Sequence, residues 1–152
     1  MFIAQTACEL IGHTPMLELK KIIPNSASRI LAKIETKNPT SIKDRAVHSM
    51  IRDAIKKRKI TKKTEVVEVS SGNTAIALAS IGSIMGFKVR IFMSELATQE
   101  RRQILSAFGA KINLTPATEH TKGARERALA YCAANPKTTF YLNQHANEAN
   151  GL

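Results

Sequence analysis

The chain has 152 residues, of which 43% are hydrophobic and 23% are charged. This length and balance are typical of one globular domain with its own core, and no apolar run approaches the length of a transmembrane helix, so we expect no membrane partner. Lysine and arginine outnumber aspartate and glutamate by 23 to 12, and the net charge of +11 favours an anionic partner, either nucleic acid or an anionic cofactor.

One positive cluster dominates this charge, and its six cations are Lys56, Lys57, Arg58, Lys59, Lys62 and Lys63. The cluster follows a predicted helix, whose dipole favours cations at that end in any case. Only 5% of the residues are aromatic, and none lies within the cluster to stack on the bases of a single strand. We therefore interpret the cluster as a solvated helix end and do not expect nucleic acid as the partner.

The two cysteines, Cys8 and Cys132, lie far apart in the sequence. They show neither metal-ligand spacing nor a disulfide pattern, so we expect no metal site and a reducing, cytoplasmic location. The first ten residues include Gln5, Thr6 and Glu9 and lack the basic start of a signal peptide, which favours the same location.

The predicted elements alternate between strand and helix from residue 29 onward. The turns are predicted at residues 11–15 and 24–26. The strands are predicted at residues 16–19, 29–35, 66–69, 88–93, 111–114 and 138–142. The helices are predicted at residues 41–58, 74–84, 98–108 and 121–134. This alternation predicts a three-layer α/β/α fold with a mainly parallel sheet and right-handed crossovers.

A parallel sheet covered by helices on both faces buries its strands. We therefore expect seven apolar side chains to be largely buried. They are Val66, Val67, Val69, Val89, Ile91, Ile112 and Leu114.

Residues 65–82 form the centre of the pattern, because a valine-rich strand turns there directly into an apolar helix. Gly72 can supply the positive φ that such a tight turn often needs. The unpaired N–H groups at the helix start and the helix dipole form a potential anion site. Hydroxyl and amide side chains at Ser70, Ser71, Asn73 and Thr74 add hydrogen-bonding groups. The turn is therefore either a carboxylate or phosphate pocket or an ordinary helix cap.

Ligands of such sheets bind at the carboxyl ends of the strands, which brings three loops together: residues 37–43, residues 70–74, and residue 143 onward. Lys43 lies in the first turn of a predicted helix that Ser41 caps together with Asp44. The helix dipole is unfavourable for a cation there and favours a neutral amine, which a Schiff-base lysine requires. The alternative is a solvated lysine that pairs with a nearby acid.

Residues 38–45, Asn-Pro-Thr-Ser-Ile-Lys-Asp-Arg, resemble the lysine motif of pyridoxal-phosphate enzymes of the tryptophan-synthase β type. Within that group the chain looks most like cysteine synthase (O-acetylserine sulfhydrylase), and cystathionine β-synthase is a close relative. Further segments resemble the same family in the same order along the chain. They are residues 11–15, 68–79, 100–110 and 142–150. The resemblance implies a tryptophan-synthase β-like fold.

The resemblance also implies residue roles. Lys43 would bind pyridoxal 5'-phosphate covalently and would take the α-proton of the substrate, and Asn73 would bond the 3-hydroxyl of the cofactor. The residues that match the family's substrate-binding positions would hold the substrate α-carboxylate. They are Ser70, Ser71, Gly72, Thr74 and Gln144. The implied reaction replaces the acetate of O-acetylserine by sulfide and gives cysteine. Relatives that act on serine, threonine or O-phosphoserine share these motifs, so the substrate stays open.

The sequence departs from the family at three places. The lysine loop is one residue short between Thr40 and Ser41, and Ala75 replaces a glycine, so that we expect its methyl group to crowd the pocket. The chain ends before the family's Gly-rich phosphate loop and before the residue that meets the pyridine nitrogen. We therefore expect a truncated fold, weak cofactor binding through Lys43 and little or no cysteine synthesis. The alternative is a non-catalytic pseudo-enzyme or binding module that keeps the carboxylate loop.

The same resemblance divides the chain into three parts. Residues 1–36 would be an arm that packs on a larger domain, residues 37–145 a small α/β domain, and residues 146–152 the start of the larger domain. Apolar surface that such a domain would cover seldom stays exposed on a monomer, so we expect a homo-oligomer or other self-association.

Overall fold

The computed structural model describes residues 3–21 and 28–151, so the turn predicted at residues 24–26 lies outside the described residues. The strands are β1 (Met16–Glu18), β2 (Leu31–Lys33), β3 (Glu65–Val69), β4 (Lys88–Ser94), β5 (Lys111–Thr115) and β6 (Thr139–Tyr141). The α-helices are α1 (Lys43–Lys56), α2 (Asn73–Met85), α3 (Gln99–Ala107) and α4 (His120–Ala134). Short 3-10 helices are η1 (Ala7–Leu10), η2 (Glu35–Lys37), η3 (Ala117–Glu119) and η4 (Glu148–Gly151).

The main sheet has four parallel strands in the order β5-β4-β3-β6. β3 lies between β4 and β6, and all five of its residues are buried. Valine fits this position because its branched side chain packs well on a pleated surface that is covered on both sides. The predicted parallel α/β fold is therefore confirmed.

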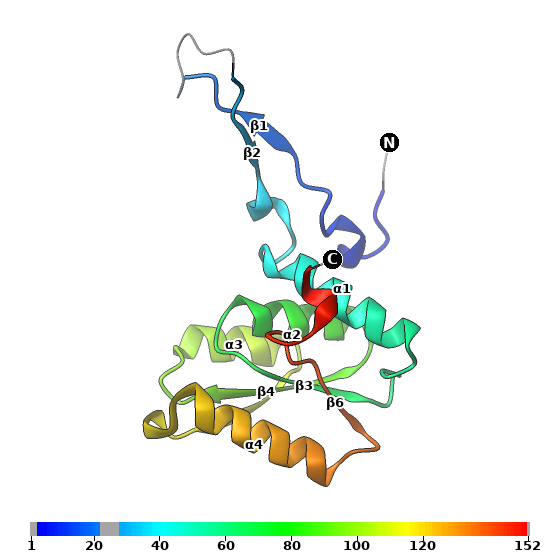
Figure 1. Ribbon diagram of the computed structural model, residues 1–152, viewed down its shortest axis with the longest axis vertical. Helices are drawn as coiled ribbons and strands as arrows, with labels where there is room; N and C mark the ends of the chain where they lie inside the picture. The colour runs from blue at the N-terminus through cyan, green and yellow to red at the C-terminus, as the bar shows by residue number, and fades with distance from the viewer. Residues whose placement is uncertain (1–2, 22–27, 152) are drawn as a thin grey trace.

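Helices cover both faces of this sheet (Figure 1). On one face α1 and α2 pack through a core that includes Val47, Ile51 and Leu78. On the other face α4 packs through Ala124 and Ala128 against Val67 and Val69 of β3. No helix in the described part of the chain is long and apolar enough to span a membrane.

The central helix α2 lies close against the sheet, as its apolar sequence predicted. A Cβ atom at Gly82 would lie 2.4 Å from Val89 Cγ2, so glycine permits the close approach of α2 to β4. Gly86 ends the helix in the left-handed conformation with φ 79°, which confirms the predicted C-cap. This packing fixes the start of α2 relative to the end of β3.

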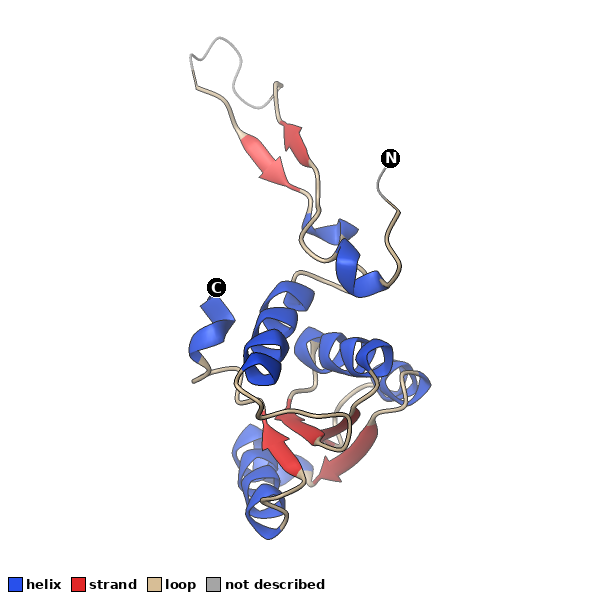
Figure 2. Ribbon diagram, turned by 90° about the vertical axis from the view of Figure 1, so that its right-hand side faces the viewer, coloured by secondary structure: helices blue, strands red, loops and turns tan. Residues whose placement is uncertain are grey.

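Two expectations about strands are wrong. The strand predicted at residues 29–35 does not join the parallel sheet, because β2 pairs antiparallel with β1 in a separate hairpin that projects from the body (Figure 2). The alternation of apolar residues predicts a strand but does not identify its partner. Leu114 is 45% exposed and Ile112 is only half-buried, because β5 is an edge strand.

The hairpin is anchored to α1 by a polar cluster of Gly12, Thr14, Glu35, Asn38 and Arg45. Arg45 Nε and Nη2 donate to Glu35 over 2.6 and 2.8 Å, and Nη2 also donates to the Gly12 carbonyl over 3.0 Å. The Gly12 N–H donates to Asn38 Oδ1 over 2.9 Å, and the Thr14 hydroxyl donates to Glu35 Oε1 over 2.9 Å. The hydrogen bonds from Arg45 are the largest cause that lowers the pKa of Glu35 to about 2. The cluster therefore joins the motif near the start of the chain to the lysine motif.

Candidate functional site

The turn from β3 into α2 forms the floor of the candidate site. Gly72 precedes the helix with φ −118° and ψ −157°, so the expected positive φ is not used and the turn is extended there. Ser70 Oγ accepts the Gly72 N–H over 3.2 Å, which shapes the turn. The backbone N–H groups of Asn73 and Thr74 have no hydrogen-bond acceptor within residues 3–21 and 28–151. These two donors at the positive end of the helix dipole suit an anion.

A long-range hydrogen bond joins this turn to the segment after β6. The hydroxyl of Thr74, a residue that is 4% exposed, donates to Gln144 Oε1 over 2.7 Å. We call this pair the Thr74–Gln144 clamp. Because the amide oxygen accepts that bond, the Gln144 NH₂ group stays available as a donor. The predicted meeting of residues 70–74 with the segment after residue 143 is therefore confirmed.

Lys43 is the first residue of α1, and its side chain is exposed. The preceding loop is held by Asp44, whose carboxylate accepts the N–H groups of Thr40 and Ser41 over 2.7 and 3.1 Å and also bonds the Thr40 hydroxyl. Ser41 Oγ accepts the Lys43 N–H over 3.2 Å, but the residue that precedes the helix as its N-cap is Ile42, whose side chain makes no capping bond. The predicted cap at Ser41 is therefore wrong by one residue, and only the bond from the Ser41 N–H to Asp44 is present as predicted. No carboxylate of the described residues lies within ion-pair distance of Lys43 Nζ, which leaves its amine unpaired with an acid.

Helices α1 and α2 lie on the same face of the sheet and both begin at its carboxyl edge (Figure 1). Lys43 and Asn73 are therefore the first residues of neighbouring helices, and both side chains are exposed. In the described part of the chain, no hydrogen bond joins Lys43 to the turn at residues 70–74. Ala75 is fully buried in the core cluster, so its methyl group faces the core and the expected crowding of the pocket is wrong.

Two charged residues of the site were missed in the sequence. Arg101, in the first turn of α3, donates from Nη1 to the Ser71 carbonyl over 3.0 Å and brings a positive charge to the turn. Glu68, on β3, is 1% exposed and accepts the Gln144 N–H over 3.0 Å. Burial raises the pKa of Glu68 against the opposing effect of its two backbone N–H donors. The sequence offered one signal for Glu68, which is that a charged residue interrupts a run of valines in a strand predicted to be buried.

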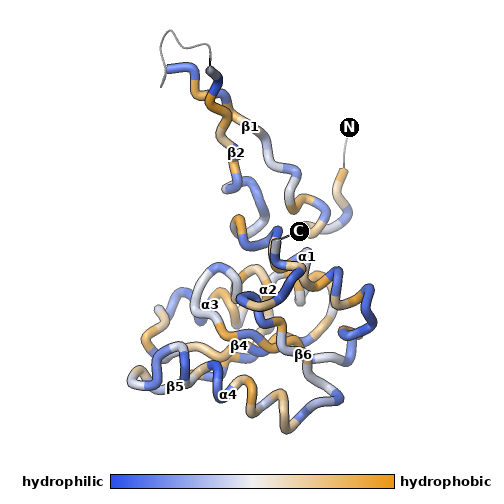
Figure 3. The backbone as a smooth tube through the Cα atoms, in the orientation of Figure 1, coloured by the Kyte–Doolittle hydropathy of each residue, from blue (hydrophilic) through white to orange (hydrophobic). Residues whose placement is uncertain are grey.

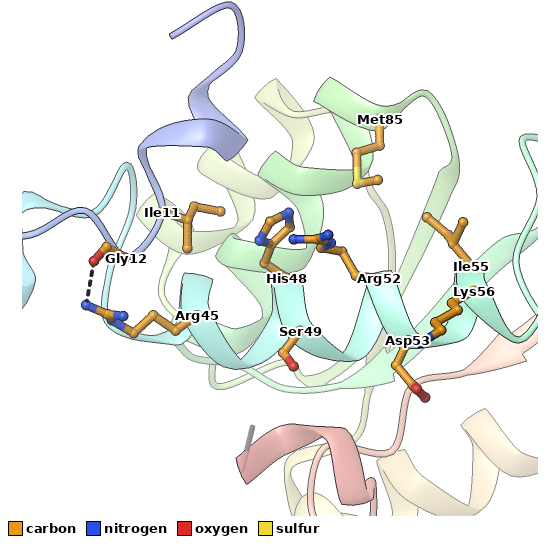
Figure 4. A pocket seen from close by; sticks show the side chains of 10 residues that line it. All are labelled: Ile11, Gly12, Arg45, His48, Ser49, Arg52, Asp53, Ile55, Lys56 and Met85. Carbon is orange, nitrogen blue, oxygen red and sulfur yellow. Dashed lines mark hydrogen bonds between the residues drawn. The ribbon is translucent and has the colours of Figure 1, made fainter. Parts of the chain in front are cut away.

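A large cavity of the described residues lies elsewhere, along the outer side of α1 beneath η1 (Figure 4). Its volume is about 760 Å³, and it is open to solvent. Arg45, His48, Arg52 and Lys56 line it together with Met85 at the end of α2. None of the predicted site residues lines this cavity, and we assign it no chemistry.

Comparison with known proteins links the chain to one family. A family model described as pyridoxal-phosphate dependent enzyme matches residues 8–152. Cysteine synthase B of Campylobacter jejuni is 41% identical over 151 residues, which cover 99% of this chain and 49% of that protein. Cysteine synthase A of Escherichia coli K12 is 42% identical over 141 residues, which cover 92% of this chain and 43% of that protein.

The crystal structure of cysteine synthase from Entamoeba histolytica superposes with a TM-score of 0.90 at 36% identity and covers 97% of this chain and 45% of that one. The chain thus spans about half the length of the relatives it matches. The family match, the relatives and the fold confirm the resemblance inferred from the sequence. The chain belongs to the family of pyridoxal-phosphate-dependent enzymes and is similar to the cysteine synthases within it.

Proposed function

We propose that the chain carries the lysine and substrate-carboxylate parts of a cysteine-synthase-like site, which replaces the acetate of O-acetylserine by sulfide. The Thr74–Gln144 clamp is the observation that carries this proposal. It joins the start of α2 to the segment after β6 over 2.7 Å, so that the Gln144 amide lies at the helix start, where the Asn73 and Thr74 N–H groups have no acceptor in the described residues. Neutral donors at a helix start suit the α-carboxylate of an amino acid.

The residues at the carboxyl edge of the sheet fit the family's cofactor, pyridoxal phosphate. Its aldehyde requires an amine, and Lys43 is exposed and free of an ion pair within the described residues. Its 3-hydroxyl requires a hydrogen-bonding partner, and the exposed Asn73 side chain is available at the first residue of α2. When bound, the cofactor supplies an electron sink for carbanion chemistry.

The proposed roles of the chain's own residues follow from these positions. Ser70, Ser71 and Gly72 would surround the substrate carboxylate together with Thr74 and Gln144. Because these donors are uncharged, they hold an anion without pairing with the Lys43 amine. Lys43 would move the proton between the substrate α-carbon and its own Nζ.

We also propose the division into an arm at residues 1–36, a small domain at residues 37–145 and the start of a further domain at residues 146–152. The projecting hairpin supports the first boundary (Figure 2). Its exposed side chains include Met16 and Leu17, at 56% and 53% exposure, which suits a segment that packs on another surface.

Titration with pyridoxal phosphate tests the function. We expect a visible absorption band that depends on Lys43 and disappears in Lys43→Ala. Lys37→Ala, which removes an exposed lysine at the end of η2, should keep the band. Sulfide-dependent formation of cysteine from O-acetylserine would support the full reaction. A band that survives Lys43→Ala would show that another lysine binds the cofactor and would overturn the assignment.

Binding of an amino acid without catalysis is the second candidate function. The clamp supports it, because Thr74 and Gln144 are already hydrogen-bonded without any contribution from Lys43. Binding of L-serine that is unchanged in Lys43→Ala, together with no Lys43-dependent band, would favour this function over the first.

A further inference from the structure

Glu68 is a buried titratable residue that the proposed chemistry does not use. It lies on the central strand β3, is 1% exposed, and follows two fully buried valines. Its Oε1 accepts the Val69 N–H over 2.7 Å and its Oε2 accepts the Gln144 N–H over 3.0 Å. No cation forms an ion pair with it among residues 3–21 and 28–151. Burying a carboxylate without a cation is costly, so its two backbone bonds are its main compensation.

The bond to Gln144 occurs where the chain leaves the sheet. The Leu142 N–H still donates to the Val67 carbonyl over 2.9 Å, as in a regular parallel ladder. Asn143 then adopts φ 52°, which turns the backbone away from β3. The next N–H, that of Gln144, meets the Glu68 side chain instead of a backbone carbonyl. The carboxylate therefore continues the ladder past the turn.

Three atoms of Gln144 are fixed by different parts of the chain. Its N–H is bonded by Glu68, its Oε1 by the Thr74 hydroxyl over 2.7 Å, and its backbone oxygen by Asn150 Nδ2 over 2.5 Å. Of these three partners, only Glu68 belongs to the sheet. Glu68 thus relates the position of Gln144 to the rigid core on which α2 also packs.

We propose that Glu68 is a positioning residue of the carboxylate site, whose ionised side chain holds the Gln144 backbone so that the Thr74–Gln144 clamp forms. The carboxylate role of the clamp rests on the proposed function, whereas the link between Glu68 and Gln144 does not. A protonated Glu68 keeps one carbonyl oxygen but cannot accept strongly at both oxygens, so the segment after β6 loosens. The clamp then loses its fixed amide.

The groups that face Glu68 do not compete for this role. Ile91 of β4 is its partner in the register, and α1 and α2 turn apolar side chains toward this face of the sheet. On β6, the pKa of Tyr141 is raised, first by burial and then by the Glu68 charge, while Arg125 lowers it. Tyr141 therefore stays neutral through the range in which Glu68 changes its charge.

The first test uses the parent chain and nuclear magnetic resonance. We expect the Gln144 and Val69 amide signals to shift together with pH, with one apparent pKa above that of an ordinary glutamate. In Glu68→Gln both shifts should disappear, and hydrogen exchange at the Gln144 amide should become faster. A Gln144 amide that does not follow the Val69 amide in the parent chain would overturn the proposal without any variant.

The second test measures binding of L-serine above the Glu68 pKa. Loss of one charge-assisted hydrogen bond corresponds to about a tenfold weakening, which we expect for Glu68→Gln. Glu65→Gln is the matched control, because it changes another carboxylate of β3 that is bonded to Arg90 and Tyr131 and not to Gln144. Equal affinity in Glu68→Gln and the parent would overturn the proposal. If the parent does not bind L-serine, the proposed function fails, while the amide titration still decides the role of Glu68.

Discussion

Glu65 and Glu68 lie three residues apart on β3, and their surroundings shift their pKa values in opposite directions. Burial raises the pKa of Glu68. For Glu65 burial also raises the pKa, but hydrogen bonds from Arg90 and Tyr131 outweigh it and the net shift is downward. Glu65 accepts a hydrogen bond from Arg90 Nε over 2.9 Å and another from the Tyr131 hydroxyl over 2.7 Å. A charged donor therefore decides which carboxylate stabilises the fold.

These shifts predict opposite pH dependences for two glutamine variants. A raised folded-state pKa gives stability at low pH that is lost as the pH rises through it, so ionised Glu68 weakens the fold. The unfolding free energy of Glu68→Gln relative to the parent should therefore rise from about pH 4 to about pH 8. A lowered folded-state pKa stabilises the fold at pH values above the unfolded-state pKa. The unfolding free energy of Glu65→Gln should therefore fall furthest below that of the parent near neutral pH, by about 3 kcal/mol for a broken buried pair. Urea unfolding at both pH values gives the unfolding free energy of each variant relative to the parent. The same change between the two pH values in both variants would contradict the prediction.

At the scale of elements, Asp44 determines how α1 begins. Its side chain is buried and accepts two backbone N–H groups of the lysine loop, from Thr40 and Ser41. These groups have no helical partner, because they precede the first turn. The position of Lys43 thus depends on the residue that follows it.

Asp44→Asn should destabilise the fold by about 1–2 kcal/mol, because it removes the negative charge at the helix start and replaces one of the two accepting carboxylate oxygens by an NH₂ group. The same variant should weaken the Lys43-dependent cofactor band. Asp53→Asn is the matched control on the same helix, since Asp53 pairs with Lys57 at 2.8 Å on the surface, and its effect should stay below about 1 kcal/mol. Thermal unfolding gives the comparison, and equal losses in both variants would show that the loop does not need Asp44.

The sequence predicted correctly those helices and strands that local signals determine. The valines of β3, the apolar α2 and Gly86 at its end have clear periodicity or backbone requirements. The pairing of β2 with β1 and the exposure of Leu114 depend on which strand lies at an edge, which no local pattern encodes. Motif resemblance pointed to Thr74 and Gln144. Glu68 and Arg101 were missed because their roles arise only when β6 and α3 pack beside the turn.

At the scale of the whole molecule, the hairpin of β1 and β2 projects from a body that is otherwise built around one sheet. Hydrophobic segments occur along both of its strands (Figure 3), and Leu17 and Leu31 are 53% and 46% exposed. Its junction with the body depends on Glu35 and Arg45, which bond over 2.6 Å. The arm is therefore attached to the body at its base and exposes apolar side chains on both of its strands.

Glu35→Gln should loosen the base of the arm without changing the sheet. The folded-state pKa of Glu35 is about 2, so its contribution is present at neutral pH and is lost only as the pH falls through about 2. At neutral pH we expect faster trypsin cleavage between the hairpin and α1 in this variant. Glu18→Gln, which removes an exposed pair with Arg29 in the hairpin itself, should leave cleavage at the base unchanged. Equal cleavage in the parent and in Glu35→Gln would show that the pair does not hold the arm.

The exposed apolar side chains of the arm predict self-association. Sedimentation of the parent chain should show concentration-dependent assembly, because apolar patches of this kind seldom stay uncovered. Leu17→Ser combined with Leu31→Ser should shift the chain toward the monomer. Ile84→Ser, at a 38% exposed residue of α2, removes an apolar group from the body and should not. A monodisperse parent monomer at all concentrations would contradict the prediction.

The Thr74–Gln144 clamp joins residues 70 positions apart, and this separation determines when it can form. The strand that carries Gln144 to its partner is β6, the last strand of the sheet, which docks on β3 from Thr139 onward. During synthesis the chain emerges from its amino end, so α2 can fold while Gln144 is still inside the ribosome. Closing so long a loop also slows refolding. Nascent chains therefore pass through a period in which the helix start is complete but the amide that faces it has not yet arrived.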